Sequence, residues 1–120
     1  MKNLDQRNQI IEFSLKLNST NLSPLRSGNI SLRAKEDDKE GYLITPSGKK
    51  YETLNPEDIV FMGLNENIEN IDSINKPSSE WRFHRDIYLN KNDAQAIVHA
   101  HSPHATAVSS HGKSIPPFHY

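Results

Sequence analysis

Short strand-like runs that end at turn-forming residues constrain the fold of this chain more than any other feature. The segment Ile30-Ser31-Leu32-Arg33 alternates apolar and polar residues, and Tyr42-Leu43-Ile44 stops at Thr45-Pro46-Ser47-Gly48. A period of two and a stop at Pro and Gly are typical of strands. The charged residues 35–40 between the two runs predict a hairpin connection. The apolar run Ile59-Val60-Phe61-Met62 predicts a third, buried strand.

Three helices are expected around these strands. Residues 4–17 predict an amphipathic helix, residues 78–90 a second helix with Ser78 as its N-cap, and residues 103–111 a third that begins at a first-turn proline. The polar residues 65–75 predict a surface excursion. Strands and helices in this order predict an α/β fold, a layered α/β/α domain whose central sheet is mainly antiparallel. The apolar residues expected to form the buried face of the first helix are Leu4, Ile11 and Leu15, with Ile10 and Leu17 beside them.

Composition limits the class of protein. A chain of 120 residues with 34% hydrophobic residues suits one domain over residues 1–120. Its 14 basic and 15 acidic residues give a net charge of -1 without a long run of either sign, which disfavours a nucleic-acid partner. No run approaches the roughly 20 apolar residues of a membrane span, and the N-terminus lacks the apolar core of a signal peptide. We therefore expect a cytoplasmic protein with no membrane partner.

A His-x-His pair indicates a metal site. The run Ala96-Ile97-Val98-His99-Ala100-His101 is strand-like, and the period of a strand places His99 and His101 on one face. The chain has no cysteine, so any metal must be held by His, Asp or Glu, and the nearby Glu80 is a third candidate ligand. Zinc suits this donor set. The alternative is that the two histidines are ordinary polar residues on the wet face of a strand, and Glu80 an ordinary acid of the first helical turn.

Three turns of small residues are candidate anion-binding loops. They are Gly28-Asn29, Ser47-Gly48 and Ser78-Ser79, and each adjoins a regular element, where backbone N–H groups are free to bind phosphate. Taken singly, each is also an ordinary turn or cap.

Four further histidines are not expected to be metal ligands. His84 lies four residues after Glu80 on the same helical face, where it could orient that carboxylate. The other three, His104, His111 and His119, are expected on the surface.

Four sequence words together resemble the class II aldolase/adducin family, most closely its aldolase branch. They occur in the order and spacing of that family, and the resemblance runs from the opening helix to Tyr120. The words are Ser27-Gly28-Asn29-Ile30-Ser31-Leu32-Arg33, Leu43-Ile44-Thr45-Pro46-Ser47-Gly48, Pro77-Ser78-Ser79-Glu80-Trp81-Arg82-Phe83-His84 and Ile97-Val98-His99-Ala100-His101.

The resemblance implies a zinc-dependent aldehyde-lyase that acts on a small ketose phosphate such as L-fuculose 1-phosphate. Glu80 would be the catalytic acid/base beside the metal, and His99 and His101 would be two of three zinc-binding histidines. Zinc would act as a Lewis acid for the enediolate left by C3–C4 cleavage. The resemblance also implies a homotetramer. Its phosphate cradle would consist of Gly28, Asn29, Ser47, Gly48, Ser78 and Ser79.

Two departures from the family pattern bear on these expectations. The chain has Pro24-Leu25-Arg26-Ser27 where the aldolase branch often has a Gly/Thr-rich turn, so Arg26 would add charge to the anion site or alter its shape. The third zinc histidine and later strands of the family lie beyond Tyr120, so the C-terminal part of the domain is expected to be missing from this sequence.

Other activities of the same superfamily remain open. A sugar-phosphate dehydratase would use the same metal and phosphate sites, and an epimerase is disfavoured because its pattern resembles Ser-Ser-Asp rather than the Ser78-Ser79-Glu80 found here. An adducin-like domain would be a non-catalytic interaction module. Retention of Glu80, His99 and His101 argues against that reading.

Overall fold

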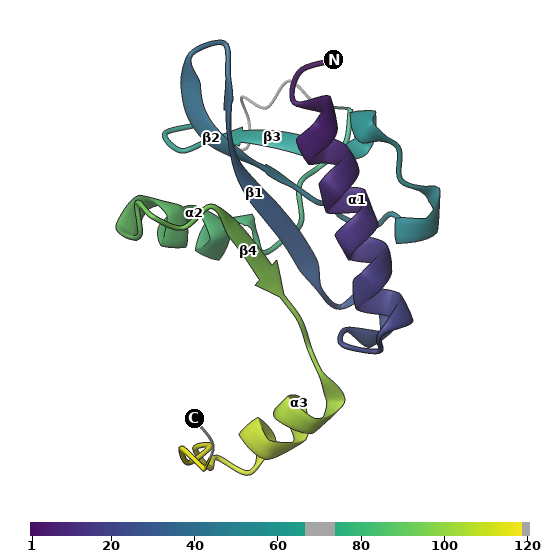
Figure 1. Cartoon of the computed structure of the whole chain (residues 1–120), viewed down its shortest axis with the longest axis vertical. Helices are drawn as coiled ribbons and strands as arrows, with labels where there is room; N and C mark the ends of the chain where they lie inside the picture. Colours follow the sequence, from purple (N-terminus) through teal and green to yellow (C-terminus); the bar gives the residue numbers. More distant parts are fainter. Residues whose placement is uncertain (67–73, 119–120) are drawn as a thin grey trace.

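The chain forms a four-stranded sheet with a helix packed on each face (Figure 1). The computed structural model describes residues 1–66 and 74–118. Its helices are α1 (Leu4–Ser19), α2 (Trp81–Asn90) and α3 (Pro103–Ser110), and its strands are β1 (Asn29–Glu36), β2 (Lys39–Ile44), β3 (Val60–Gly63) and β4 (Ala96–His99). Short 3-10 turns occupy Pro24–Arg26, Tyr51–Thr53 and Pro56–Asp58.

The sheet is antiparallel throughout, with strand order β3-β2-β1-β4. The predicted hairpin joins β1 to β2 through Asp37 and Asp38, whose φ angles of 46° and 63° fit a type I′ turn. The predicted third strand is confirmed as β3, paired with β2. Register places Asn29 of β1 directly opposite His99 of β4. The Gly28-Asn29 turn and the predicted metal-binding strand therefore lie side by side.

The side chains of β2 alternate between two hydrophobic clusters. Leu43 packs in the cluster that contains Ile10 of α1, whereas Tyr42 packs in the cluster that contains Trp81 and Tyr88 of α2. Successive residues of a strand point to opposite faces, so α1 and α2 cover opposite faces of the sheet. The expected layered α/β/α arrangement with an antiparallel central sheet is confirmed for the described residues.

Helix α1 forms where the sequence predicts it, and the face that it buries is the predicted one in part. Ile10 and Leu17 are buried and Ile11 packs against the same core cluster, as predicted. The prediction is wrong for Leu4 and Leu15, which are 47% and 38% exposed. The buried face of the helix carries Arg7, Ile10, Ser14 and Leu17.

The buried polar side chains of α1 are satisfied by backbone carbonyls. The Arg7 guanidinium donates to the carbonyl oxygens of Pro56 and Ile59 at 3.1 and 2.5 Å, and the Ser14 hydroxyl donates to the Ile10 carbonyl at 2.7 Å. Burial of a polar group costs little when it is hydrogen-bonded. Counting apolar residues alone could not reveal this face.

Helix α2 begins at Trp81 rather than at Ser78, so the predicted N-cap is wrong. Pro77 and Ser78 are held against the loop after β2, because the Ser78 N–H donates to the Thr45 carbonyl at 2.9 Å and Pro77 forms a β-bridge with Pro46. Residues 79–80 then form a turn that leads into the helix. Glu80 therefore occupies the N-cap position. The segment that carries Ser78 and Ser79 lies against the loop after β2.

Helix α3 confirms the third predicted helix. It contains no buried residue, and it lies beyond the end of β4, away from the sheet (Figure 1). The two histidines at its ends, His104 and His111, are exposed as predicted, whereas His119 lies outside the described residues. Residues 67–73 of the predicted surface excursion also lie outside them. None of the helices formed by residues 1–66 and 74–118 is long and apolar enough to cross a membrane.

Candidate metal and phosphate site

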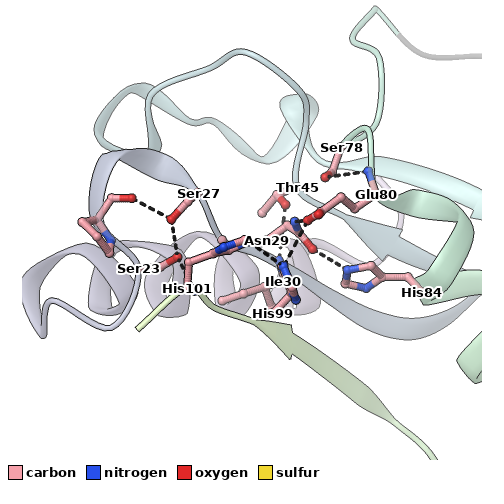
Figure 2. Close-up of polar contacts among 12 residues, drawn as sticks. Ser23, Ser27, Asn29, Ile30, Thr45, Ser78, Glu80, His84, His99 and His101 are labelled. Carbon is pink, nitrogen blue, oxygen red and sulfur yellow. Dashed lines mark hydrogen bonds and ion pairs between the residues drawn. The ribbon is translucent and has the colours of Figure 1, made fainter. Parts of the chain in front are cut away.

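Two histidines and one carboxylate converge at the end of β4. The Nε2 atoms of His99 and His101 are 2.8 Å apart, and Oε2 of Glu80 is 3.4 Å from Nε2 of His99. Strand β4 ends at His99, so the prediction that His101 also lies in the strand is wrong. The two rings meet nonetheless, with their planes at 88° (Figure 2).

The donor set fits zinc. One nitrogen or oxygen atom from each of the three residues lies within 4.8 Å of the others. Ligand atoms 2.0–2.2 Å from a tetrahedral zinc ion are roughly 3.3 Å from one another. Nε2 of His99 lies 2.8 Å from Nε2 of His101 and 3.4 Å from Oε2 of Glu80, which is close to that spacing. Two imidazole nitrogens and a carboxylate oxygen are ligands of borderline hardness that suit this ion.

The segment that carries His99 and His101 is hydrogen-bonded to the loop before β1. The backbone N–H of His101 donates to the Ser23 hydroxyl at 3.3 Å, and this hydroxyl also lies 3.0 Å from that of Ser27 (Figure 2). A Cβ atom placed on Gly28 would lie only 2.6 Å from both the His99 carbonyl oxygen and the Ser23 hydroxyl. Glycine is therefore required at position 28 by the close approach of the two segments.

Replacement of Gly28 by alanine is expected to destabilise the protein by about 2 kcal/mol or more, because the new methyl group would push β4 away from β1. The urea midpoint of unfolding measures this effect. Gly48→Ala is the matched control, because Gly48 has φ of 76° but no neighbour within 4 Å of an added Cβ. It should cost only about 1 kcal/mol of backbone strain. Equal losses in the two variants would contradict the packing role of Gly28.

All six residues predicted to bind phosphate line one pocket of about 400 Å³. Glu80 lies on the same wall, so the pocket adjoins the histidine pair. Among the residues that the structure describes, the hydroxyls of Ser47 and Ser79 have no hydrogen-bond partner, which leaves them free to bind an anion. The pocket is lined by Leu25, Arg26, Ser27, Gly28, Asn29, Thr45, Pro46, Ser47, Gly48, Lys49, Tyr51, Ser78, Ser79 and Glu80.

The pocket also contains two cationic side chains. Lys49 is paired with Asp58 at 2.5 Å, whereas no carboxylate in the described part of the chain lies within ion-pair distance of Arg26. Leu25 and Arg26 adopt left-handed backbone conformations, with φ of 56° and 59°, which non-glycine residues rarely do. The departure from the family pattern noted in the sequence therefore falls on the wall of the pocket.

The side chain of Asn29 is engaged with Glu80 rather than with the open pocket. Its amide nitrogen donates to Oε2 of Glu80 at 2.6 Å, and its carbonyl oxygen accepts a hydrogen bond from Nε2 of His84 (Figure 2). The predicted partnership of His84 with Glu80 is thus indirect, through Asn29. Sequence reasoning missed Ser31, whose hydroxyl lies 2.7 Å from Nδ1 of His84. The strand period could have revealed it, because residues 29 and 31 share a face.

Burial lowers the pKa of His84 to about 4, and the neighbouring His99 acts in the same direction. The side chain is inaccessible to solvent, so a charged imidazolium would be poorly solvated there.

Stability is expected to fall as the pH is lowered from about 6.5 to about 4. In this window the unfolded chain binds a proton at His84 and the folded chain does not, so the stabilisation present above pH 6.5 is lost, by up to about 3 kcal/mol. Urea titrations at a series of pH values measure this loss. His84→Gln is the control, since it cannot titrate there. An unchanged slope in that variant would assign the acid sensitivity to other groups.

Comparison with known proteins establishes the family to which this fold and site belong. Residues 8–120 match the family model described as "Class II Aldolase and Adducin N-terminal domain". The chain belongs to the class II aldolase/adducin family.

Several aldolases are similar to the chain. It is 43% identical over 112 residues to the L-fuculose phosphate aldolase of Escherichia coli, covering 93% of this chain and 49% of that protein. It is 40% identical over 114 residues to the 5-methylthioribulose-1-phosphate/5-deoxyribulose-1-phosphate aldolase of Rhodospirillum rubrum, covering 95% and 48%. A solved L-fuculose 1-phosphate aldolase superposes with a TM-score of 0.87 at 32% identity, covering 100% of this chain and 55% of that one. The chain spans about half the length of the curated relatives it matches.

Proposed function

We propose that the protein of which this chain forms part is a metal-dependent aldehyde-lyase. It would cleave a small ketose 1-phosphate into dihydroxyacetone phosphate and an aldehyde. One observation carries the proposal: Glu80 lies on the wall of the pocket with the small-residue turns, and its Oε2 atom is 3.4 Å from Nε2 of His99. A substrate phosphate in the pocket would bring the adjoining carbons to the metal and to the carboxylate.

The phosphate would be bound by the turns that line the pocket. Within residues 1–66 and 74–118, the hydroxyls of Ser47 and Ser79 have no hydrogen-bond partner and can donate to a ligand. Ser78 and the backbone at Gly28 and Gly48 line the same pocket. Asn29 would contribute to the same wall through its backbone, because its side chain is engaged with Glu80. Arg26 adds a positive charge, which favours a dianionic ligand.

His99, His101 and Glu80 would hold a divalent metal ion, for which zinc is the best candidate. When bound, the ion supplies Lewis-acid stabilisation of the negative charge that develops when the C3–C4 bond breaks. The carboxylate of Glu80 would move the proton at the carbon that becomes part of dihydroxyacetone phosphate. A lysine Schiff base is not needed for this chemistry.

The proposal names a class of substrates, the small ketose 1-phosphates, rather than one sugar. L-fuculose 1-phosphate and 5-deoxyribulose 1-phosphate are both ketose 1-phosphates, and relatives named for each are 43% and 40% identical to this chain. The chain matches about half of each relative, and the proposal extends to this class of substrate only. A homo-oligomer, a tetramer by resemblance to the family, and a location in the cytoplasm are parts of the same proposal.

Release of dihydroxyacetone phosphate from L-fuculose 1-phosphate and from 5-deoxyribulose 1-phosphate tests the proposal. The purified natural protein is assayed with added Zn²⁺ and after chelation of the metal. Metal-dependent release from either sugar supports an aldolase. Loss of water from 5-methylthioribulose 1-phosphate without release of dihydroxyacetone phosphate would instead identify a dehydratase. Neither reaction with any of the three sugars would reject the proposed function in favour of a non-catalytic module.

A further inference from the structure

A continuous chain of hydrogen bonds leads from the interior of the sheet to Glu80. The hydroxyl groups of Tyr88 and Ser31 are 2.8 Å apart, and that of Ser31 is 2.7 Å from Nδ1 of His84. Nε2 of His84 contacts Oδ1 of Asn29, and Nδ2 of Asn29 is 2.6 Å from Oε2 of Glu80. Figure 2 shows its outer part, with Asn29 between the imidazole and the carboxylate.

The chemistry of the groups sets the direction of each bond. An ionised carboxylate only accepts, so Asn29 must present its NH₂ group to Glu80 and its carbonyl oxygen to His84. His84 must therefore carry its proton on Nε2. Its Nδ1 atom is then an acceptor, which the Ser31 hydroxyl can satisfy while accepting in turn from Tyr88.

The inner part of this series of hydrogen bonds is buried in the core. His84, Ser31 and Tyr88 are fully buried, and Asn29 is 4% exposed. The three inner groups come from the middle of β1 and from α2, so their positions are determined by core packing. The bond to Asn29 ends on the same oxygen, Oε2, that lies 3.4 Å from His99.

We propose that His84 is a positioning residue for Glu80. Through its Nε2–H group it orients the amide of Asn29, and this amide holds Oε2 of the carboxylate toward the histidine pair. The effect of His84 on turnover rests on the proposed function, but its effect on the geometry of Asn29 and Glu80 does not. Such outer hydrogen bonds to a metal-site ligand typically contribute 10- to 100-fold to metal affinity or activity.

Two variants with amide side chains separate positioning from packing. In His84→Gln the side-chain nitrogen reaches close to the place of Nε2, so a donor to Asn29 is retained. In His84→Asn the shorter side chain places its amide near Nδ1, so it can contact Ser31 but not Asn29. Both variants keep a buried polar side chain at this position, and thermal unfolding monitors the fold of each.

The first measurement is a long-range ¹H–¹⁵N correlation NMR spectrum of the imidazole rings in the wild-type protein at pH 7.5, which shows which ring nitrogen carries the proton. We expect His84 to carry its proton on Nε2. A ring protonated on Nδ1 would overturn the proposal, whatever the variants do, because Asn29 would then be oriented the other way.

The second measurement compares wild type and both variants by Zn²⁺ affinity in competition with a chelator and by the side-chain amide signals of Asn29. His84→Asn should weaken Zn²⁺ binding about 10- to 100-fold and shift the Asn29 signals, whereas His84→Gln should restore both. Unchanged Asn29 signals in His84→Asn would reject the proposal. If the wild-type protein binds no Zn²⁺, the zinc assignment of the site fails, and the Asn29 signals alone decide whether His84 positions Glu80.

Discussion

His99→Ala and His101→Ala are each expected to abolish stoichiometric metal binding. Each substitution removes one of the three donor atoms that lie within 4.8 Å of one another. The two residues that remain would then supply only two ligand atoms. Because loss of a group that merely orients a ligand already costs 10- to 100-fold in affinity, loss of a ligand should cost roughly 100-fold or more. Metal content per chain after dialysis, measured by atomic emission, checks this result.

His104→Ala is the matched control, because His104 is exposed in α3 and belongs to no cluster of donor atoms found among the described residues. It should retain the metal content of the wild type. Equal metal content in all three variants would show that the ion binds elsewhere. Metal absent from the wild type but present in a longer form of the protein would show that the histidine pair and Glu80 need a further ligand.

Glu80→Gln is expected to retain much of the metal but to lose turnover by about 10²- to 10⁴-fold. The amide has the shape of the carboxylate, and its carbonyl oxygen can still accept from Asn29, so the two histidines keep their surroundings. It cannot take up a proton at neutral pH, which removes the acid/base function. Rates of dihydroxyacetone phosphate release, compared with metal content, separate the two effects.

Glu57→Gln is the control for this substitution. Glu57 is an exposed acid that does not line the pocket, so its loss should leave both metal content and rate unchanged. If Glu80→Gln cleaved the sugar phosphate at the wild-type rate, the assignment of Glu80 as the acid/base would be wrong. If it lost metal as completely as His99→Ala, its main role would be that of a ligand.

The local pattern of apolar, polar and turn-forming residues predicted the strands and the third helix well. The alternation in residues 30–33, the stop after Ile44 and the apolar run 59–62 correspond to β1, β2 and β3, because the signals for a strand are contained in a few neighbouring residues. The errors came where tertiary contacts override local preference. Arg7 is buried because carbonyls from a distant turn accept its hydrogen bonds. The predicted start of α2 at Ser78 is wrong because Ser78 is hydrogen-bonded to Thr45.

The candidate site was predicted as separate parts. Spacing indicated the histidine pair and the three turns, and Glu80 stood close to them in the sequence. Their convergence depends on the register of β1 against β4, which places Asn29 opposite His99, and on the β-bridge between Pro46 and Pro77 before α2. The use of the Asn29 side chain could not be predicted, because it depends on a buried imidazole 55 residues away in the sequence.

The sequence by itself determined the chemistry available to this protein. Residue type and local spacing are sufficient to exclude thiolate ligands, to pair His99 with His101 and to place small residues at three turns. Only the tertiary structure decided which donors meet and how each is oriented. Hydrogen bonds between segments far apart in the chain set the direction of Asn29, and through it the position of the Glu80 carboxylate beside His99.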